Sequence, residues 1–312
     1  MLEHRFAKLA AAATFVLLVI GGTVNPTGSS LACPEPTLVC HGQLFPPMVG
    51  GVLYEHGHRL AAMTVGMLQI ALTYLLFTRR RDLRKLAWLL LGLILAQGSL
   101  GAITVKYKLP PAVSTCHLLL GMSYFATLIY TAFRTRPAPT AMELRRHDDM
   151  RAELGSTRRW IFAACAAVFV QLLLGALVRH LGAAMVCLGM PTCTRSGEWW
   201  PAAHVQQLHM IHRAFGCVVA AVTTVAAVQV LRTAKSWATL RTLAMIAPLL
   251  VAAQIALGVL TVLTMRAVPL AVGHFAGAAS LWALWMSAWL LTGERRTVAI
   301  AEPMPVVAEA VA

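Results

Sequence analysis

Eight long apolar stretches constrain this chain more than any other feature of its sequence. They run over residues 6–24, 56–78, 86–105, 113–133, 159–179, 205–231, 242–263 and 270–291. A helix needs about 20 mostly apolar residues to cross a bilayer, whereas a barrel strand would alternate over about 10. Only 12% of the residues are charged, against roughly a quarter in soluble domains. The sequence therefore predicts an all-α integral membrane protein with eight transmembrane helices.

The net charge of +14 is distributed as a topology signal. Basic residues gather in alternate loops, within 5–8, 79–85, 134–159, 232–241 and 295–296. Loops rich in Lys and Arg remain in the cytoplasm. We therefore expect both termini to be cytoplasmic, membrane lipid to surround the chain, and no nucleic-acid partner.

The second half of the sequence repeats the first at a nearly constant offset of 153 to 157 residues. Cys33, Cys40, His58, Arg59, Gln97, Gly101, Thr104, Val105 and His117 recur as Cys187, Cys193, His212, Arg213, Gln254, Gly258, Thr261, Val262 and His274. Four helices per repeat give both halves the same orientation, which predicts parallel repeats around an axis along the membrane normal.

We expect two pseudo-symmetric four-helix bundles, residues 1–133 and 159–292. A polar cytoplasmic linker (134–158) would join them, and a disordered cytoplasmic tail (293–312) would follow. The first stretch has the basic start and apolar core of a signal peptide. Because it belongs to the repeat, we expect it to be retained as a helix.

Four histidines would lie at one depth, near the external ends of the even-numbered helices: His58, His117, His212 and His274. Ionisable groups inside a membrane are costly and usually functional. A zinc site would need three or four closely spaced ligands, whereas each half offers two. Helical bundles hold cofactors in their cores and haem iron accepts axial histidines. One haem site in each half is therefore favoured over isolated polar contacts.

Residues next to these histidines could have more than one role. The guanidinium groups of Arg59 and Arg213 suit the propionates of a haem, and would equally suit lipid headgroups. Gln97 and Gln254 can hydrogen-bond within the bundle. Gly101 and Gly258 can let a helix or a ring approach closely.

The halves differ three residues before the first histidine of each pair, where Glu55 aligns with His209. Residues three apart share a helix face, so only one site has a carboxylate. We expect the first half to hold a reacting molecule, with Glu55 moving protons, and the second half to hold an electron-transfer cofactor. The alternative is that Glu55 ties down a loop or pairs with Arg59. His41, His56, His180 and His204 have no repeat partner and are expected to be loop or interfacial residues.

Each large external loop contains two cysteines, Cys33 with Cys40 and Cys187 with Cys193. An oxidising exterior permits disulfides, which would hold a lid over each site. A redox-active pair is the alternative, since strain or exposure makes a disulfide reducible.

In the order in which they occur, several motifs resemble those of the haem A synthase family. They are "GGTVNPTGSSLACPEPTLVC", Glu55-x-x-His58-Arg59, Gln97-Gly98 with Gly101, "CHLLLG" at His117, "QLLLGALVRH" at Gln171, "HMIHR" at His212 and "VGHFAGA" at His274. The resemblance covers about residues 5 to 292. It implies an eight-helix membrane enzyme that oxidises a ring methyl of haem O to a formyl group by successive hydroxylations, giving haem A for terminal oxidases.

The resemblance also implies roles for the matched residues. His212 and His274 would bind the iron of a haem b cofactor, and His58 and His117 would bracket the iron of the substrate haem. Glu55 matches the family's acidic position, and both cysteine pairs would form disulfides, Cys33–Cys40 and Cys187–Cys193. Such pairs indicate a bacterial plasma membrane. Molecular oxygen and an external electron donor are expected, and haem O synthase, the protohaem farnesyltransferase, is a candidate partner.

Two other functions fit the histidine pairs. A di-haem membrane cytochrome would pass electrons from quinol and would need no carboxylate at Glu55. A non-catalytic haem carrier would release its haem unchanged.

Overall fold

A computed structural model describes residues 1–293, in which the regular structure is helical apart from one isolated β-bridge between Cys40 and Gln43. Eight of its helices are long and apolar enough to cross a membrane. They are α1 (Leu2–Val24), α2 (Gly50–Arg79), α3 (Arg84–Lys106), α4 (Pro111–Arg134), α6 (Thr157–His180), α7 (His204–Thr233), α8 (Ala238–Leu263) and α9 (Val268–Gly293). The predicted class, an all-helical multi-pass membrane protein, is confirmed.

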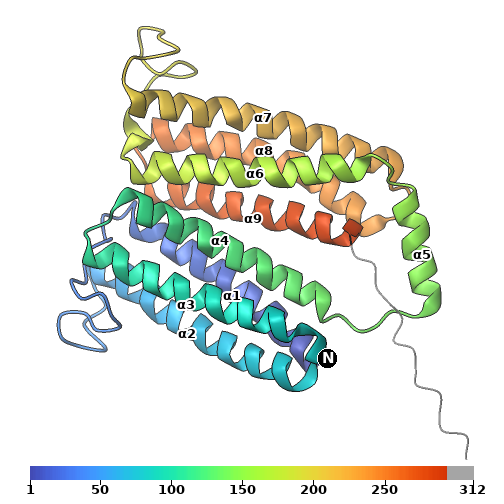
Figure 1. The fold of residues 1–312 in the computed structure, drawn as a ribbon. Coiled ribbons are helices and arrows are strands. Elements are labelled where there is room, and N and C mark those ends of the chain that lie inside the picture. The colour runs from blue at the N-terminus through green and yellow to red at the C-terminus, as the bar shows by residue number, and fades with distance from the viewer. Residues whose placement is uncertain (294–312) are drawn as a thin grey trace, which may run out of the picture.

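The helices form two groups of four that lie side by side, α1–α4 and α6–α9 (Figure 1). Contacts between the groups are made by α4 and α1 on one side and α6 and α9 on the other. The indole N–H of Trp282 in α9 also donates a hydrogen bond to the backbone oxygen of Met122 in α4, at 3.2 Å. The two groups are therefore joined along their inner helices.

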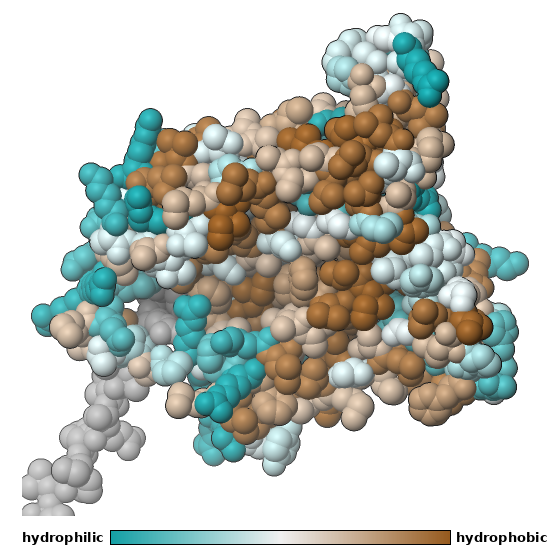
Figure 2. Space-filling model, turned by 180° about the vertical axis from the view of Figure 1, so that it is seen from behind, coloured by the Kyte–Doolittle hydropathy of each residue, from teal (hydrophilic) through white to brown (hydrophobic). Residues whose placement is uncertain are grey.

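Apolar side chains fill the interior of each group and also cover the outside. Leu72, Leu90 and Leu128 belong to a buried cluster shared by α1–α4. A second buried cluster contains Phe125 and Trp285 and connects α4 with α6–α9. Figure 2 shows one broad apolar face between more hydrophilic ends, as expected of a surface that lipid covers rather than water.

The linker between the groups is not purely irregular, because it contains α5 (Ala141–Ala152). Thr140 and Glu143 form a capping box at its start, an arrangement that satisfies two backbone N–H groups. Helix α5 has no buried residue and lies at the end of the bundle opposite the two disulfide loops (Figure 1). The predicted tail lies outside the described residues except for Gly293, the last residue of α9.

The turns α3–α4 and α8–α9 share an unusual backbone conformation. Lys108 and Leu109 have φ of 54° and 65°, and Met265 and Arg266 have φ of 53° and 70°. Such values are uncommon for residues other than glycine. The repeat thus extends to the backbone at positions 157 residues apart, which supports the predicted relation between the halves; the symmetry of the whole bundles stays a prediction.

The 3₁₀ segments are short. One, η1 (Arg81–Leu83), joins α2 to α3, and the other, η2 (Ala183–Met185), begins the loop after α6.

Candidate haem-binding site

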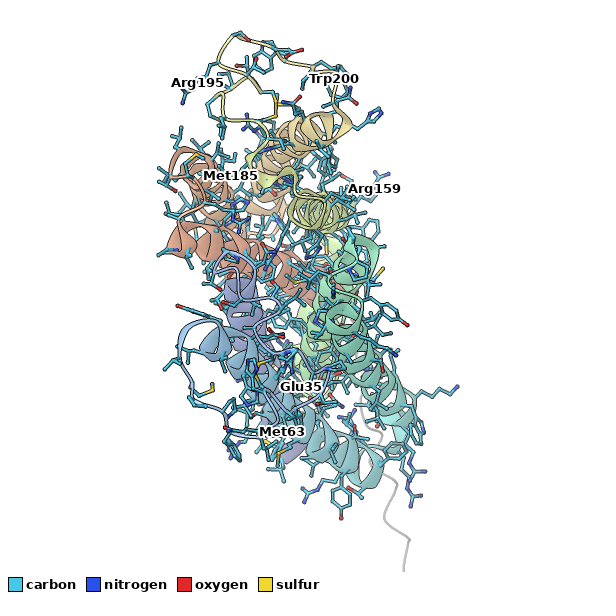
Figure 3. The ribbon with its side chains drawn as sticks, turned by 90° about the vertical axis from the view of Figure 1, so that its left-hand side faces the viewer. Glu35, Met63, Arg159, Met185, Arg195 and Trp200 are labelled. Atoms are coloured by element: carbon cyan, nitrogen blue, oxygen red, sulfur yellow. A yellow bond between two sulfur atoms is a disulfide. The ribbon has the colours of Figure 1, made fainter. Side chains whose placement is uncertain are left out.

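The four predicted histidines lie at one end of the bundle, the end that carries the disulfide loops 25–49 and 181–203. This end is called the loop end below. Each histidine is the seventh or ninth residue of its helix: His58 in α2, His117 in α4, His212 in α7 and His274 in α9. Figure 3 looks at the loop end, with Glu35 in the first loop and Arg195 and Trp200 in the second.

Each of these histidines packs against a glycine on the preceding transmembrane helix. A Cβ added at Gly21 would lie 2.7 Å from Cε1 of His58, and one at Gly101 would lie 3.2 Å from Cε1 of His117. In the second half, a Cβ at Gly175 would lie 3.2 Å from His212 and one at Gly258 would lie 3.1 Å from His274. At Gly21 a Cβ could not be placed without a shift, and at the other three glycines it would be unusually tight. Glycine therefore lets each imidazole ring approach the neighbouring helix closely.

The sequence analysis identified Gly101 and Gly258 and missed Gly21 and Gly175. Gly21 and Gly175 could have been recognised from the repeat, because they are 154 positions apart, the same offset as His58 and His212. One glycine–histidine contact is therefore repeated four times in the fold.

A glutamine lies four residues before the glycine that faces three of the four histidines, and for two of them its side chain bonds the histidine backbone. The amide nitrogens of Gln97 and Gln171 donate to the backbone oxygens of His117 and His212, at 2.8 and 3.0 Å. Beside the fourth histidine, His58, the corresponding position in α1 is Leu17. The predicted side-chain hydrogen bonding within the bundle is confirmed for Gln97, whereas the side-chain nitrogen of Gln254 is buried without a partner.

His274 is held in the tautomer that a metal ligand requires. Its Nδ1 lies 3.0 Å from the backbone oxygen of Gln254, and a carbonyl oxygen only accepts, so Nδ1 carries the proton. The lone pair is then on Nε2, and an N–H bond to a carbonyl is the usual way in which a ligand histidine is oriented.

The spacing of His212 and His274 fits one metal ion between them. Their ring centres are 6.5 Å apart and their planes are inclined by 85°. Two imidazoles bound from opposite sides, each at about 2 Å, have ring centres about 6 Å apart. The Nδ1 atoms of His58, His117 and His212 are buried and without a hydrogen-bond partner. The ring spacing and the donor atoms of His212 and His274 thus fit one iron between them.

Helix α1 forms a wall shared by the two sites. Gly21 faces His58, and the next residue, Gly22, faces Phe275, which follows His274. The guanidinium of Arg179 lies over the Phe275 ring at 5.9 Å and donates to the backbone oxygen of Gly22 at 3.4 Å. Consecutive residues of one helix therefore touch a side chain from each site.

Arg59 fastens the first loop over its site. Its Nη1 donates to the backbone oxygens of Glu35, Thr37 and Val39 at 2.6 to 3.1 Å, and its Nη2 donates to that of Cys33 at 3.1 Å. Arg213 does the same in the second half, donating to Gly189, Thr192 and Cys187 at 2.7 to 3.0 Å. Both loops are closed by disulfides, Cys33–Cys40 and Cys187–Cys193.

Glu55 forms both contacts of the structural alternative, an ion pair with Arg59 and a hydrogen bond to the first loop. It is only 4% exposed. Its Oε1 pairs with Nη2 of Arg59 at 2.5 Å, and its Oε2 accepts the backbone N–H of Cys33 at 2.9 Å. His209, at the matching position, is equally buried at 4% exposure and its Nδ1 has no partner. The difference between the halves therefore lies inside the protein, three residues before His58 and His212.

The first loop also organises a carboxylate outside the membrane-spanning helices. Hydrogen bonds from the backbone N–H groups of Glu35 itself, Gly42 and His41 lower the pKa of the Glu35 carboxyl below its usual value. A charged Glu35 thus holds the two ends of the loop turn together.

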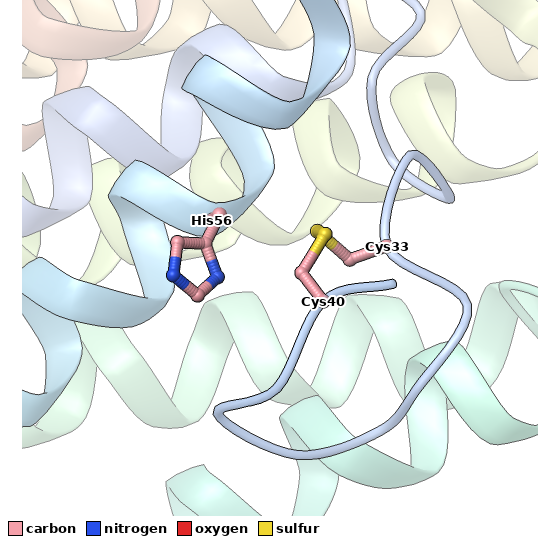
Figure 4. Close-up of side chains that lie close together, drawn as sticks. All are labelled: Cys33, Cys40 and His56. Carbon is pink, nitrogen blue, oxygen red and sulfur yellow. A yellow bond between two sulfur atoms is a disulfide. The ribbon is translucent and has the colours of Figure 1, made fainter. Parts of the chain in front are cut away.

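The expectation for His56 is wrong. His56 lies in α2 and is completely buried. Its Nε2 bonds the backbone oxygen of Leu44 at 2.9 Å, and the ring lies against the Cys33–Cys40 disulfide (Figure 4). The loop folds back over the start of α2, which a sequence pattern does not reveal.

We predict that Gly21→Ala lowers the melting temperature of the protein in detergent, because the added Cβ would press on His58. Overpacking of this kind costs about 1–3 kcal/mol. Gly92→Ala is the matched control, since Gly92 is helical and has no atom near its Cβ position. There alanine should stabilise the helix by about 0.5–1 kcal/mol. Equal melting temperatures for the two variants would contradict the contact.

Comparison with known proteins agrees with this arrangement. Residues 48–286 match the COX15-CtaA family, described as cytochrome oxidase assembly protein. A heme A synthase of Bacillus mycoides is 26% identical over 305 residues, covering 95% of this chain and 96% of the relative. The heme A synthase of Bacillus licheniformis is 25% identical over 266 residues, covering 84% and 86%. That of Exiguobacterium sibiricum is 28% identical over 221 residues, covering 67% and 71%.

The family match includes all four histidines and extends through every transmembrane helix from α2 onward, ending within α9. On this match, the chain belongs to the COX15-CtaA family of cytochrome oxidase assembly proteins.

Proposed function

We propose that this protein is a haem A synthase, which oxidises a ring methyl of haem O to a formyl group by successive hydroxylations and loss of water. Family membership and relatives named heme A synthase over most of their length support this reaction. One structural observation carries it further: two histidine pairs face one end of the bundle, and only one pair has a buried carboxylate beside it.

In this proposal the second half holds haem b between His212 and His274. The 6.5 Å separation of the rings and the tautomer of His274 support it. Haem b would supply one-electron redox chemistry. The protein's part is to hold the two rings against Gly175 and Gly258 and to close the site with the loop that Arg213 binds.

The first half would bind haem O between His58 and His117. In α1 the position of the glutamine is Leu17, so the backbone of His58 lacks the bond that His117 and His212 receive. The shared α1 wall would bring the substrate close to the cofactor, since Gly21 and Gly22 contact one site each. Electrons from an external donor would then reach the substrate through the second half, and molecular oxygen would be the oxidant.

Glu55 is the group in the first site that can hold and release a proton. Each of its oxygens has one partner, and a carboxylate has about four acceptor positions. The bonds to Arg59 and the Cys33 N–H fix the position of the Glu55 carboxylate and leave some of its hydrogen-bond acceptor positions free. A positioned acid or base typically contributes about 10²–10⁴-fold to a rate.

Arg59 and Arg213 remain proposed partners of the haem propionates. Both use their Nη atoms on loop carbonyls. The Nε of Arg213 is buried without a partner, so this N–H is the donor left for a propionate.

The chain would lie in a bacterial plasma membrane with both termini in the cytoplasm. Basic residues concentrate in alternate loops and at the end that carries α5, as cytoplasmic loops do. The loop end, with its two disulfides, would face the oxidising exterior. Haem O synthase, which makes the substrate, is a candidate partner at this membrane.

We predict that His212→Ala and His274→Ala each reduce the b-type haem absorbance of the purified protein to background, because each removes one of the two residues that would hold the haem. His204→Ala is the matched control, since His204 starts the same helix as His212, is exposed and bonds only Gln207. Full haem absorbance in either ligand variant would refute the cofactor assignment.

We predict that Glu55→Gln leaves the protein folded and loaded with haem but lowers product formation about 100-fold or more. Glutamine keeps the shape and the bond to the Cys33 N–H and loses the charge. Glu35→Gln changes the same residue type in the first loop, outside α2, and should form product normally. Product formation by Glu55→Gln at the level of Glu35→Gln would refute a proton-transfer role.

A further inference from the structure

The last two residues of α6, Arg179 and His180, lie at the boundary between the two groups of helices. The ring nitrogen Nδ1 of His180 lies 3.1 Å from Oγ1 of Thr115 in α4. Thr115 comes two residues before His117 in the same helix. Helix α6 belongs to the second half, but its end therefore contacts the first half beside a predicted ligand of the first site.

Arg179 makes a similar contact with α1. Its Nη2 donates to the backbone oxygen of Gly22 at 3.4 Å, and the residue before Gly22 is the glycine that packs against His58. The charge of Arg179 acts on His58. At the second site, the arginine whose charge acts on His212 is Arg213. Arg179 is therefore a residue of the second half whose charge is felt at the first site.

The guanidinium of Arg179 has an unused donor and no counter-charge. Within residues 1–293 it forms no ion pair with a carboxylate, and its Nε is buried without a hydrogen-bond partner. A second cation, Arg266, is close enough for the two charges to repel each other. A guanidinium held away from water without an anion is destabilising, so this position favours an anionic ligand.

The arginine that the first half itself brings to the site is already engaged. Arg59 uses both Nη atoms on loop carbonyls and on Glu55, and Glu55 neutralises its charge. In the second half the position of Glu55 is taken by His209, which leaves the charge of Arg213 available. Arg59 therefore has little charge to offer a ligand of the first site, whereas Arg179 does.

The repeat shows that this contribution is one-sided. At the offset of 154 residues, Arg179 and His180 align with Asn25 and Pro26, which follow α1. Neutral residues thus stand where α1 would make the reciprocal contribution to the second half. The cationic end of α6 is therefore a second difference between the halves, in addition to Glu55.

We propose that the first haem site is composite: Arg179, from the second half, binds a propionate carboxylate of the haem held by His58 and His117. This inference rests on the proposed function, because it takes haem O to be the occupant of the first site. A guanidinium recognises a carboxylate through its planar set of N–H donors. The free Nε is the donor that Arg179 has available for it.

A purely structural role is the alternative. Arg179 and Arg266 both donate to carbonyl groups at the end of α1, Arg179 to Gly22 and Arg266 to Asn25 at 3.2 Å, and basic side chains stabilise a helix C-terminus. Arg266→Gln is therefore the matched control. It removes the same kind of bond from the same helix end, and the arginines whose charges act on His58 are Arg59 and Arg179.

The test is a binding titration of the haem-b-loaded protein in detergent. Haem O and its dimethyl ester, which lacks both propionate charges, are added separately. Binding at the first site is the part of the absorbance change that His58→Ala abolishes. We expect the wild type to bind the free acid about 10- to 100-fold more tightly than the ester, as for a hydrogen bond to a charged group.

In Arg179→Gln this preference for the free acid should disappear while the affinity for the ester stays the same. Arg179→Lys keeps the charge and should keep part of the preference, and Arg266→Gln should keep all of it. Retained haem b absorbance in each variant shows that the fold is intact.

Three results would overturn the proposal. An equal loss of affinity for haem O and for its ester in Arg179→Gln would assign Arg179 to the support of α1, as would the same change in Arg266→Gln. Loss of the preference in Arg179→Lys as complete as in Arg179→Gln would contradict recognition by charge. Loss of haem b from Arg179→Gln would place Arg179 at the second site.

A failure of the proposed function gives a different result. If the wild type shows no haem O binding that depends on His58, the first site is not a haem O site and the proposed reaction fails together with this inference. If such binding occurs and Arg179→Gln keeps the full preference for the free acid, only the contribution of Arg179 is refuted.

Discussion

The structure depends first on the absence of water from the bilayer interior. Backbone N–H and C=O groups there must be satisfied within the protein, so the chain crosses as eight long helices. For the same reason, irregular backbone and charged side chains lie near the ends of the helices, outside the bilayer interior. Arginine clamps, disulfides and the ligand histidines consequently share the loop end, where Arg59 and Arg213 bind the carbonyl groups that the irregular loops expose.

Among these helices, the same contact between a glycine and a histidine occurs four times. A glycine on one helix makes room for an imidazole on the next, and a glutamine one turn away bonds the backbone of two of the four histidines. The two halves differ at the start of α2 and α7. Glu55 replaces His209 and His56 replaces Met210, which places a carboxylate and a disulfide-facing imidazole in the first half alone.

Much of this could be predicted from the sequence because its causes are local or periodic. Helix length, apolar composition and the 154-residue offset identify the spans, the four histidines and the cysteine pairs. Gly175 could have been found from the same offset. The burial of His56 could not, since it follows from a loop folding back onto α2. For Glu55 the sequence offered the loop contact and the Arg59 pair as alternatives, and the structure shows both. Helix α5 was not predicted from the sequence, because most of its side chains are polar and none is buried.

The most direct test of the central claim is chromatography of the haems extracted from cells that supply haem O, with and without this protein. Haem A, or its hydroxylated precursor, should appear only when the protein is present. It should be lost in His58→Ala and His117→Ala proteins that still bind haem b. Unchanged haem O in cells containing haem-loaded protein would contradict the proposed oxidation and leave electron transfer or haem carriage.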